Sequence, residues 1–263
     1  MKVAYFPGCT LKTKAKELDK YARKCAEILD ISLEEIEDWQ CCGGVFTTSR
    51  DEVATKLSSV RALSAAKDTN NILVTVCSAC HNVIKQTNYA MQNDAEFASR
   101  VNNYLGAGKE YDGTTQVLHY LELLRDTVGF DNLAKKVTNS LQGKKIAAYY
   151  GCLLLRPSTV MAMDDPENPT IMEDFIKALG GTAVVYPERN ECCGGYITLE
   201  NPAFANTRSH KVTQSAYAAG ADIIVTACPL CKYNLEKNGS PVPVVYFTDL
   251  LAEALGVKED TNA

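Results

Sequence analysis

The chain has 263 residues, of which 46% are hydrophobic and 22% charged, and its formal net charge is −5 at pH 7. This length suffices for one large domain or two modest ones, and the negative charge gives no general attraction to nucleic acid or to anionic membranes. No apolar run is long enough to span a membrane, and Pro7 interrupts the amino terminus too early for a signal peptide, so we expect a cytoplasmic protein.

In the first half of the chain, short apolar runs alternate with segments of helical periodicity. The sequence predicts strands at residues 3–6, 36–39, 72–76 and 117–120. Helices are expected at residues 15–29, 51–67 and 121–128, and a further helix opens after residue 77 and runs towards Met91. The polar segment 93–115 carries no pattern that assigns it to a helix or a strand.

The second half repeats this plan, with a turn-rich insertion at residues 164–169. Strands are expected at residues 145–150, 183–186 and 223–227, and helices at residues 170–179 and 202–219. Such alternation is typical of an α/β fold with mainly parallel sheets. We therefore expect two tandem, pseudo-symmetric α/β repeats at residues 1–128 and 145–257, joined by a linker at 129–144 and followed by a frayed tail at 258–263.

Ten of the eleven cysteines form two matching sets of five. Each set has a single cysteine after a glycine, a Cys-Cys-Gly-Gly turn and a Cys-x-x-Cys motif. The first set is Cys9, Cys41, Cys42, Cys77 and Cys80, and the second is Cys152, Cys192, Cys193, Cys228 and Cys231. Both sets fall at the carboxyl ends of expected strands, where open α/β sheets place their ligand sites. The remaining cysteine, Cys25, lies on the apolar face of a helix and is expected to be a buried hydrophobic residue.

Three kinds of chemistry could use these cysteines. Structural zinc takes four thiolates and would leave one cysteine of each set unused. Dithiol exchange accounts for the Cys-x-x-Cys motifs but not for two sets of five. Iron–sulfur clusters are favoured, although the dense Cys-x-x-Cys-x-x-Cys run of ordinary cubane clusters is absent, so the clusters should be unusual. The chain also lacks the glycine-rich fingerprints of dinucleotide and phosphate sites, so no flavin or nucleotide is expected in it.

The cysteine pattern resembles the CCG-domain family, and within it the iron–sulfur B subunit of heterodisulfide reductase. Residues 150–157, residues 164–167 and Cys228-Pro229-Leu230-Cys231 fit the same resemblance. It implies that each set of five holds a noncubane 4Fe-4S cluster, and that a disulfide such as that of coenzyme M and coenzyme B is reduced to two thiols between the clusters. Each cluster would supply one electron and receive one sulfur.

The resemblance also implies partners, because this chain has no cubane motif to relay electrons. They are a ferredoxin-like C subunit and a flavin-containing A subunit, joined to a hydrogenase or formate dehydrogenase module in an electron-bifurcating complex of anaerobic metabolism and methanogenesis. Bacterial relatives serve other acceptors, so a thiol oxidation or another acceptor is an alternative function. A non-catalytic zinc scaffold is a second alternative.

One departure from the family concerns the residue after Cys152, which is Leu153 where the family often has a histidine that could protonate a leaving thiolate. His81 and His210 are possible substitutes. An anionic substrate would also need positive charge nearby. The candidates for this charge are Lys12, Lys14, Arg50 and Arg156, of which Lys12 and Arg156, together with His81, are the expected substrate-binding residues.

Overall fold

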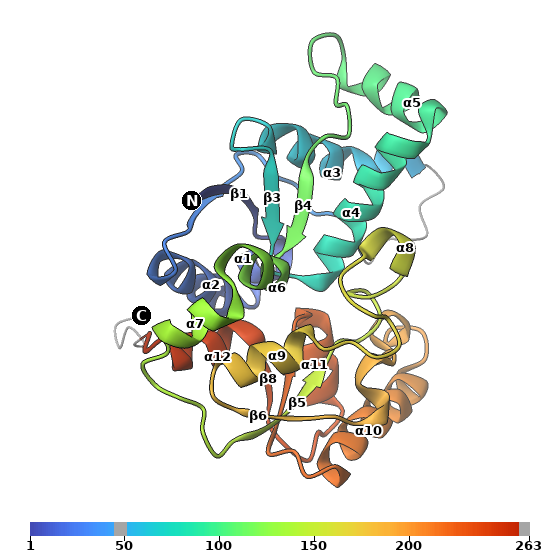
Figure 1. Cartoon of the computed structure of the whole chain (residues 1–263). Helices are drawn as coiled ribbons and strands as arrows, with labels where there is room; N and C mark the ends of the chain where they lie inside the picture. Colours follow the sequence, from blue (N-terminus) through green and yellow to red (C-terminus); the bar gives the residue numbers. More distant parts are fainter. Residues whose placement is uncertain (45–51, 258–263) are drawn as a thin grey trace.

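The computed structural model describes residues 1–44 and 52–257, which form two α/β halves, each built on a four-stranded parallel sheet. In Figure 1 the first half is the upper, blue-to-green part and the second half is the lower, yellow-to-red part. The strands are β1 (Lys2–Phe6), β2 (Ser32–Glu35), β3 (Ile72–Thr75), β4 (Gln116–His119), β5 (Lys145–Tyr149), β6 (Thr182–Val184), β7 (Ile223–Thr226) and β8 (Val244–Tyr246). The predicted fold class is confirmed.

Helices connect the strands within each half. The first half contains α1 (Cys9–Thr13), α2 (Lys16–Ile28), α3 (Glu52–Ala66), α4 (Ser78–Asn93), α5 (Ala95–Leu105), α6 (Tyr120–Leu123), the π-helical turn η1 (Leu124–Val128) and α7 (Phe130–Lys136). The second half contains α8 (Ser158–Met161), α9 (Ile171–Ala178), the 3-10 turns η2 (Pro187–Asn190) and η3 (Gly195–Ile197), α10 (Pro202–Ala218), α11 (Pro229–Lys237) and α12 (Phe247–Ala254).

The strand order is the same in both sheets and locates the functional edge. The order is β2-β1-β3-β4 in the first sheet and β6-β5-β7-β8 in the second. In each sheet the second strand of the half lies on one side of the first strand. The third and fourth strands lie on its other side. Ligands of open α/β sheets bind beyond the carboxyl ends of the strands at this reversal. Here the reversal lies between β1 and β3 and between β5 and β7, and each of these four strands leads into a cysteine.

A strand and a helix of the first half illustrate where the structure differs from the sequence expectation. A strand was expected at residues 36–39, but the strand in this region is β2, at Ser32–Glu35. It lies at the edge of the sheet, and all its side chains are half-buried. Its charged sequence lacks the apolar run that marks an inner strand, and Asp38 turns the chain with a φ of 53°. The segment without a pattern contains α5, whose amino end is capped by the Asp94 side chain, which accepts a hydrogen bond from the Phe97 N–H at 2.9 Å.

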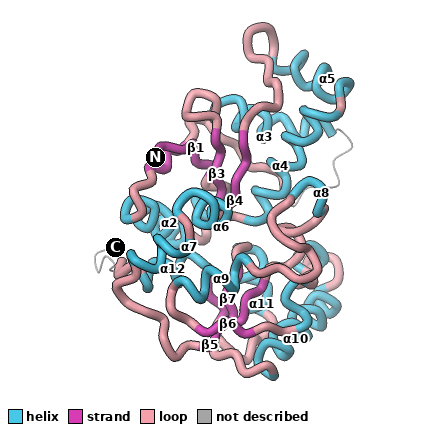
Figure 2. Tube along the Cα trace, in the orientation of Figure 1, coloured by secondary structure: helices cyan, strands magenta, loops and turns pink. Residues whose placement is uncertain are grey.

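The two halves share one apolar core. Helix α12 packs on α2, and α9 packs on α6 and α7, so helices of both halves meet between the two groups of strands (Figure 2). The Phe247 ring lies 5.9 Å from that of Tyr120 and 6.2 Å from that of Phe175. Helix α7 lies within the segment expected to be a linker. Within the described residues, no helix has the length and apolar character needed to cross a membrane.

Candidate functional site

The first set of cysteines gathers at the carboxyl edge of the first sheet. Cys9 opens α1 after β1, Cys41 and Cys42 follow β2, and Cys77 caps the amino end of α4, in which Cys80 lies one turn later. The sulfur of Cys41 is 3.5 Å from that of Cys9, and the sulfur of Cys42 is 3.3 Å from that of Cys80. Cys77 interacts with Cys80 in turn. Cys41 also hydrogen-bonds to Cys42, so the five sulfurs form one continuous row.

The second set repeats this arrangement at the carboxyl edge of the second sheet. Cys152 follows β5, Cys228 follows β7, and Cys231 lies in α11. The sulfur of Cys193 is 3.6 Å from that of Cys231, which also interacts with Cys228. At the other end of the row, Cys192 interacts with Cys152 and with Cys193. The sequence predicted both sets, and the structure brings together all five members of each.

Hydrogen bonds among the sulfurs give some of these cysteines thiolate character. The pKa of Cys42 is lowered to about 3 because the thiols of Cys41 and then Cys80 donate to its sulfur. The pKa of Cys192 is lowered to about 2, mainly because Cys152 and Cys193 do the same there. Thiolates, rather than thiols, are the form in which cysteine binds metal. Each row is therefore an electron-rich donor set.

Neighbouring helices hold the two Cys-Cys-Gly-Gly turns. The carbonyl oxygen of Cys193 accepts hydrogen bonds from the Ser209 hydroxyl at 3.0 Å and from the Asn234 amide at 2.7 Å. In the first half the Ser58 hydroxyl donates to the carbonyl oxygen of Cys41 at 2.9 Å. Ser58 and Ser209 stand at equal distances after their respective turns in the sequence. The cysteine side chains are thus oriented by residues that are not themselves sulfur donors.

The two Cys-x-x-Cys motifs begin next to each other. The hydroxyl of Tyr246 lies 2.7 Å from the carbonyl oxygen of Val76 and 2.8 Å from that of Ala227. The ring of His119 contacts the same two carbonyls, with its Nε2 3.0 Å from the Val76 oxygen. The Ser78 hydroxyl donates to the Ala227 oxygen at 2.7 Å. Because Val76 and Ala227 each precede a motif cysteine, the two motifs start side by side.

Two residues close to the cysteines were missed by the sequence reasoning. Tyr196 follows the second turn, and its hydroxyl donates to the carbonyl oxygen of Gly44 in the first turn. Arg208 of α10 donates through its Nε to the carbonyl oxygen of Cys192 at 3.3 Å and pairs with Glu191 at 2.7 Å. Its charge helps to lower the pKa of Cys192. No local pattern marks either residue, because each acts on a turn reached through the fold.

The two basic residues expected to bind substrate have carboxylate partners. Lys12 lies with its Nζ 2.7 Å from Glu35. The Arg156 guanidinium is 2.9 Å from Glu167 and donates to the carbonyl oxygen of Asn190 at 3.0 Å. An anionic substrate that bound either cation would have to compete with these pairs.

His81, the third expected substrate-binding residue, is completely buried. Its Nε2 is 3.3 Å from Glu122, whose other oxygen is 3.2 Å from the Nζ of Lys85. Burial, His119 and Lys85 lower the pKa of His81, so its ring is neutral at pH 7. The chain therefore places a neutral imidazole behind the first row of sulfurs.

The other candidates are exposed, half-buried or outside the described residues. His210 is exposed on α10, and Lys14 is exposed at the end of α1. Arg50 falls outside the described residues. Leu153 is half-buried, and the Asn82 side chain of the first half donates to its carbonyl oxygen at 2.8 Å. The turn after Cys152 is thus held by a helix of the other half.

The donor set fits an iron–sulfur group. All eleven cysteines are free thiols, and burial raises the pKa of Cys25 to about 12, as befits a residue outside both rows. Across residues 1–44 and 52–257, no three or more His, Cys, Asp or Glu side chains are arranged to hold a single metal ion. Each row instead offers five sulfurs from three strand ends, and thiolates of this kind are what iron–sulfur clusters use.

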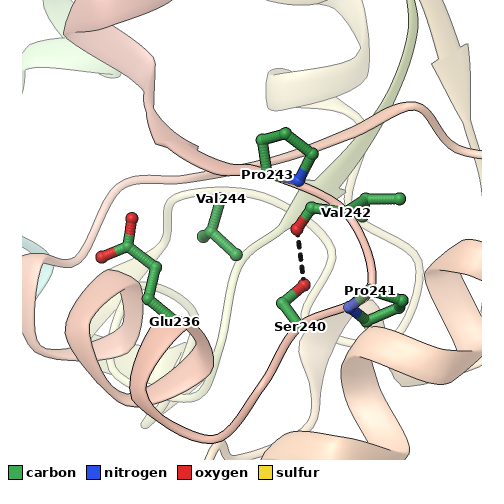
Figure 3. Close-up of a pocket in the computed structure, with 6 residues that line it drawn as sticks. All are labelled: Glu236, Ser240, Pro241, Val242, Pro243 and Val244. Carbon is green, nitrogen blue, oxygen red and sulfur yellow. Dashed lines mark hydrogen bonds between the residues drawn. The ribbon is translucent and has the colours of Figure 1, made fainter.

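A surface pocket elsewhere in the chain is unrelated to the cysteines. It has a volume of about 420 Å³ and is lined by Glu236, Ser240, Pro241, Val242, Pro243 and Val244 (Figure 3). Val244 begins β8, so the pocket lies at the amino end of a parallel strand. The cysteines emerge at the opposite, carboxyl edge of the sheet.

Comparison with known proteins matches both cysteine sets. The cysteine-rich domain family CCG matches residues 3–85 and 146–236, which include all ten cysteines of the rows. The membrane anchor subunit of the 8-methylmenaquinol:fumarate reductase of Wolinella succinogenes is 32% identical, over 97% of this chain and 92% of its own length. The B subunit of the ferredoxin:CoB-CoM heterodisulfide reductase of Methanosarcina mazei is 28% identical, over 98% of this chain and 91% of its own.

A solved structure shares the fold. The crystal structure of a hypothetical protein from Helicobacter pylori superimposes with a TM-score of 0.76 at 14% sequence identity. The match covers 98% of this chain and 49% of that chain, so the present chain spans about half of the larger protein. At this identity the likeness concerns the fold alone.

Proposed function

This chain belongs to the cysteine-rich CCG domain family, and we propose that it is the iron–sulfur component of a multi-subunit oxidoreductase that reduces a disulfide to two thiols. The observation that carries the proposal is that the Cys-x-x-Cys motifs of the two five-sulfur rows start side by side. Val76 and Ala227, which lead into the two Cys-x-x-Cys motifs, are hydrogen-bonded by the same two side chains, Tyr246 and His119. Two redox groups held there would face a common substrate.

The reaction consumes two electrons and two protons, cleaves one S–S bond and yields two thiols. Two noncubane 4Fe-4S clusters, one on each row, would supply the electrons one at a time and would attract the soft sulfur atoms of the substrate. The chain itself contributes the thiolates that hold these clusters and the hydrogen bonds that orient the Cys-Cys-Gly-Gly turns. Lys12 and Arg156 are the proposed contacts for anionic groups of the substrate.

The electrons come from partner proteins, because the described chain carries no further cysteine set to relay them. The relatives named above are themselves subunits of larger reductases, which supports an assembly of this kind. We propose a ferredoxin-like protein as the immediate donor and a flavin-containing protein behind it. Eleven free thiols suit a reducing compartment, so the cytoplasm is the proposed location.

A second candidate keeps the same redox groups but changes the substrate. The relative from Wolinella succinogenes is named as part of a fumarate reductase that uses 8-methylmenaquinol, so it is not assigned to a disulfide. Leu153 favours this alternative, since it offers no proton to a leaving thiolate. In that case the chain would pass electrons between a donor and another acceptor.

The test begins with iron and acid-labile sulfide per chain in protein purified without oxygen. About eight of each, with EPR spectra unlike those of a reduced cubane, would support two unusual clusters. Two zinc ions without sulfide would refute the proposal and leave a structural scaffold. Two assays then separate the two candidate functions. In one, a reduced viologen dye donates electrons to the coenzyme M–coenzyme B disulfide, and in the other a menaquinol analogue donates electrons to an oxidised dye.

A further inference from the structure

Tyr196 joins the two cysteine turns. It belongs to η3, three residues after Cys193, and its hydroxyl donates to the carbonyl oxygen of Gly44, two residues after Cys42. The bond therefore runs from the second turn to the first and spans 152 residues of sequence. A single side chain links the loops that carry the two vicinal cysteine pairs.

Tyr196 interacts electrostatically with cysteines of both rows. The pKa of Tyr196 is raised first by burial and then by its interactions with Cys228 and Cys152 of the second row and with Cys42 and Cys77 of the first. Its side chain nevertheless keeps 38% of its surface exposed. Tyr196 thus interacts with both rows and is also partly exposed to solvent.

The link is made by one half only. Cys42 and Gly44 correspond in the repeat to Cys193 and Gly195, so the sequence counterpart of Tyr196 is Val45. Valine has no hydroxyl and cannot form the reciprocal bond. Val45 itself lies outside the described residues, and the link is defined by Tyr196 and Gly44 alone.

We propose that Tyr196 is a positioning residue that fixes the separation of the two redox sites. This inference rests on the proposed function, in which one disulfide must reach both rows. The hydroxyl holds the first turn against the second, while the exposed ring forms part of the wall along which the substrate sulfurs lie. Misplacement of reacting groups by about 1 Å can cost on the order of 100-fold in rate.

The experiment compares Tyr196→Phe with Tyr217→Phe in the cluster-loaded chain. The first variant removes only the linking hydroxyl, and the second removes the hydroxyl of an exposed tyrosine in α10 of the same half. We expect Tyr196→Phe to retain wild-type iron and sulfide but to raise amide hydrogen exchange in residues 41–44 about fivefold, as loss of one hydrogen bond predicts. The magnetic coupling between the two clusters, measured by EPR, should change, and kcat for disulfide cleavage should fall roughly tenfold or more with little change in KM.

Tyr217→Phe should leave all of these quantities at wild-type values. Unaltered exchange and unaltered magnetic coupling in Tyr196→Phe would overturn the inference, as would a loss of iron that accounts for the whole fall in kcat. If the wild-type chain cleaves no disulfide, the proposed function fails. The exchange and EPR measurements would still decide whether Tyr196 sets the spacing of the sites.

Discussion

Alanine in place of either turn glycine should destabilise the chain, but far more at Gly194 than at Gly43. Both residues adopt left-handed backbone angles, with φ of 81° at Gly194 and 76° at Gly43. A side chain at such angles costs roughly 1–2 kcal/mol. This backbone cost is the same for both variants. A difference in stability between them therefore reports the surroundings of the added Cβ atom.

The surroundings of the two glycines differ. A Cβ atom on Gly43 would have its nearest neighbour at 3.7 Å, which is an ordinary contact. A Cβ atom on Gly194 would lie 2.9 Å from the Cα of Ala205 and 3.4 Å from the Cβ of Arg208, so helix α10 would have to move. Overpacking of this kind adds about 1–3 kcal/mol. The expected totals are about 1–2 kcal/mol for Gly43→Ala and about 2–5 kcal/mol for Gly194→Ala.

Thermal unfolding without oxygen measures the difference. At about 2–4 °C per kcal/mol for a chain near this size, Gly43→Ala should lower Tm by roughly 2–8 °C and Gly194→Ala by roughly 4–20 °C. Displacement of α10 should also release Ser209 from the carbonyl of Cys193, so iron should be lost from the second row first. Equal losses of Tm and iron in the two variants would refute this reasoning, because the backbone cost alone would then explain both.

Three further predictions concern other residues. Cys42→Ser and Cys193→Ser should each remove about half of the iron and sulfide while the other half stays folded, and full iron in either variant would contradict the assignment. Cys25, with its pKa raised to about 12, should resist alkylation in the folded chain at pH 8, and mass spectrometry of iodoacetamide-treated protein checks this. Burial is the main cause that lowers the pKa of His119 from 6.5 to about 3. Between these two pH values the unfolded chain therefore binds a proton at His119 that the folded chain does not. Stability should therefore fall as pH drops from 7 to 5.5, less so in His119→Asn, as urea titrations would measure.

Features that repeat or that follow local rules could be predicted from the sequence. The two cysteine rows followed from matched spacing and from the rule that parallel strands present ligands at their carboxyl ends. Even α5 carried a usable signal, since Asp94 stands at its amino cap and Gly106, with a φ of 85°, at its carboxyl cap. That signal was overlooked because its few apolar residues, such as Phe97 and Val101, lie in a polar segment.

Partners brought together by the fold could not be predicted. From the sequence, Lys12 was expected to be a free cation, but in the structure it pairs with Glu35. Glu35 lies on edge strand β2, whose charged sequence does not predict a strand. Tyr196 likewise reads as one more surface aromatic residue until the fold brings it to Gly44. Such pairings depend on packing between segments that are distant in the sequence. A single sequence contains no pattern that predicts this packing.

His119 and Tyr246 occupy equivalent places in the two halves, and both contact the carbonyls of Val76 and Ala227. The two halves therefore reach these carbonyls with different side chains, a histidine in one half and a tyrosine in the other. Two identical halves would present the same groups to both ends of a ligand. In a fused chain each half can mutate alone, as the histidine–tyrosine pair illustrates, so the site can evolve to hold an unsymmetrical molecule in a single orientation.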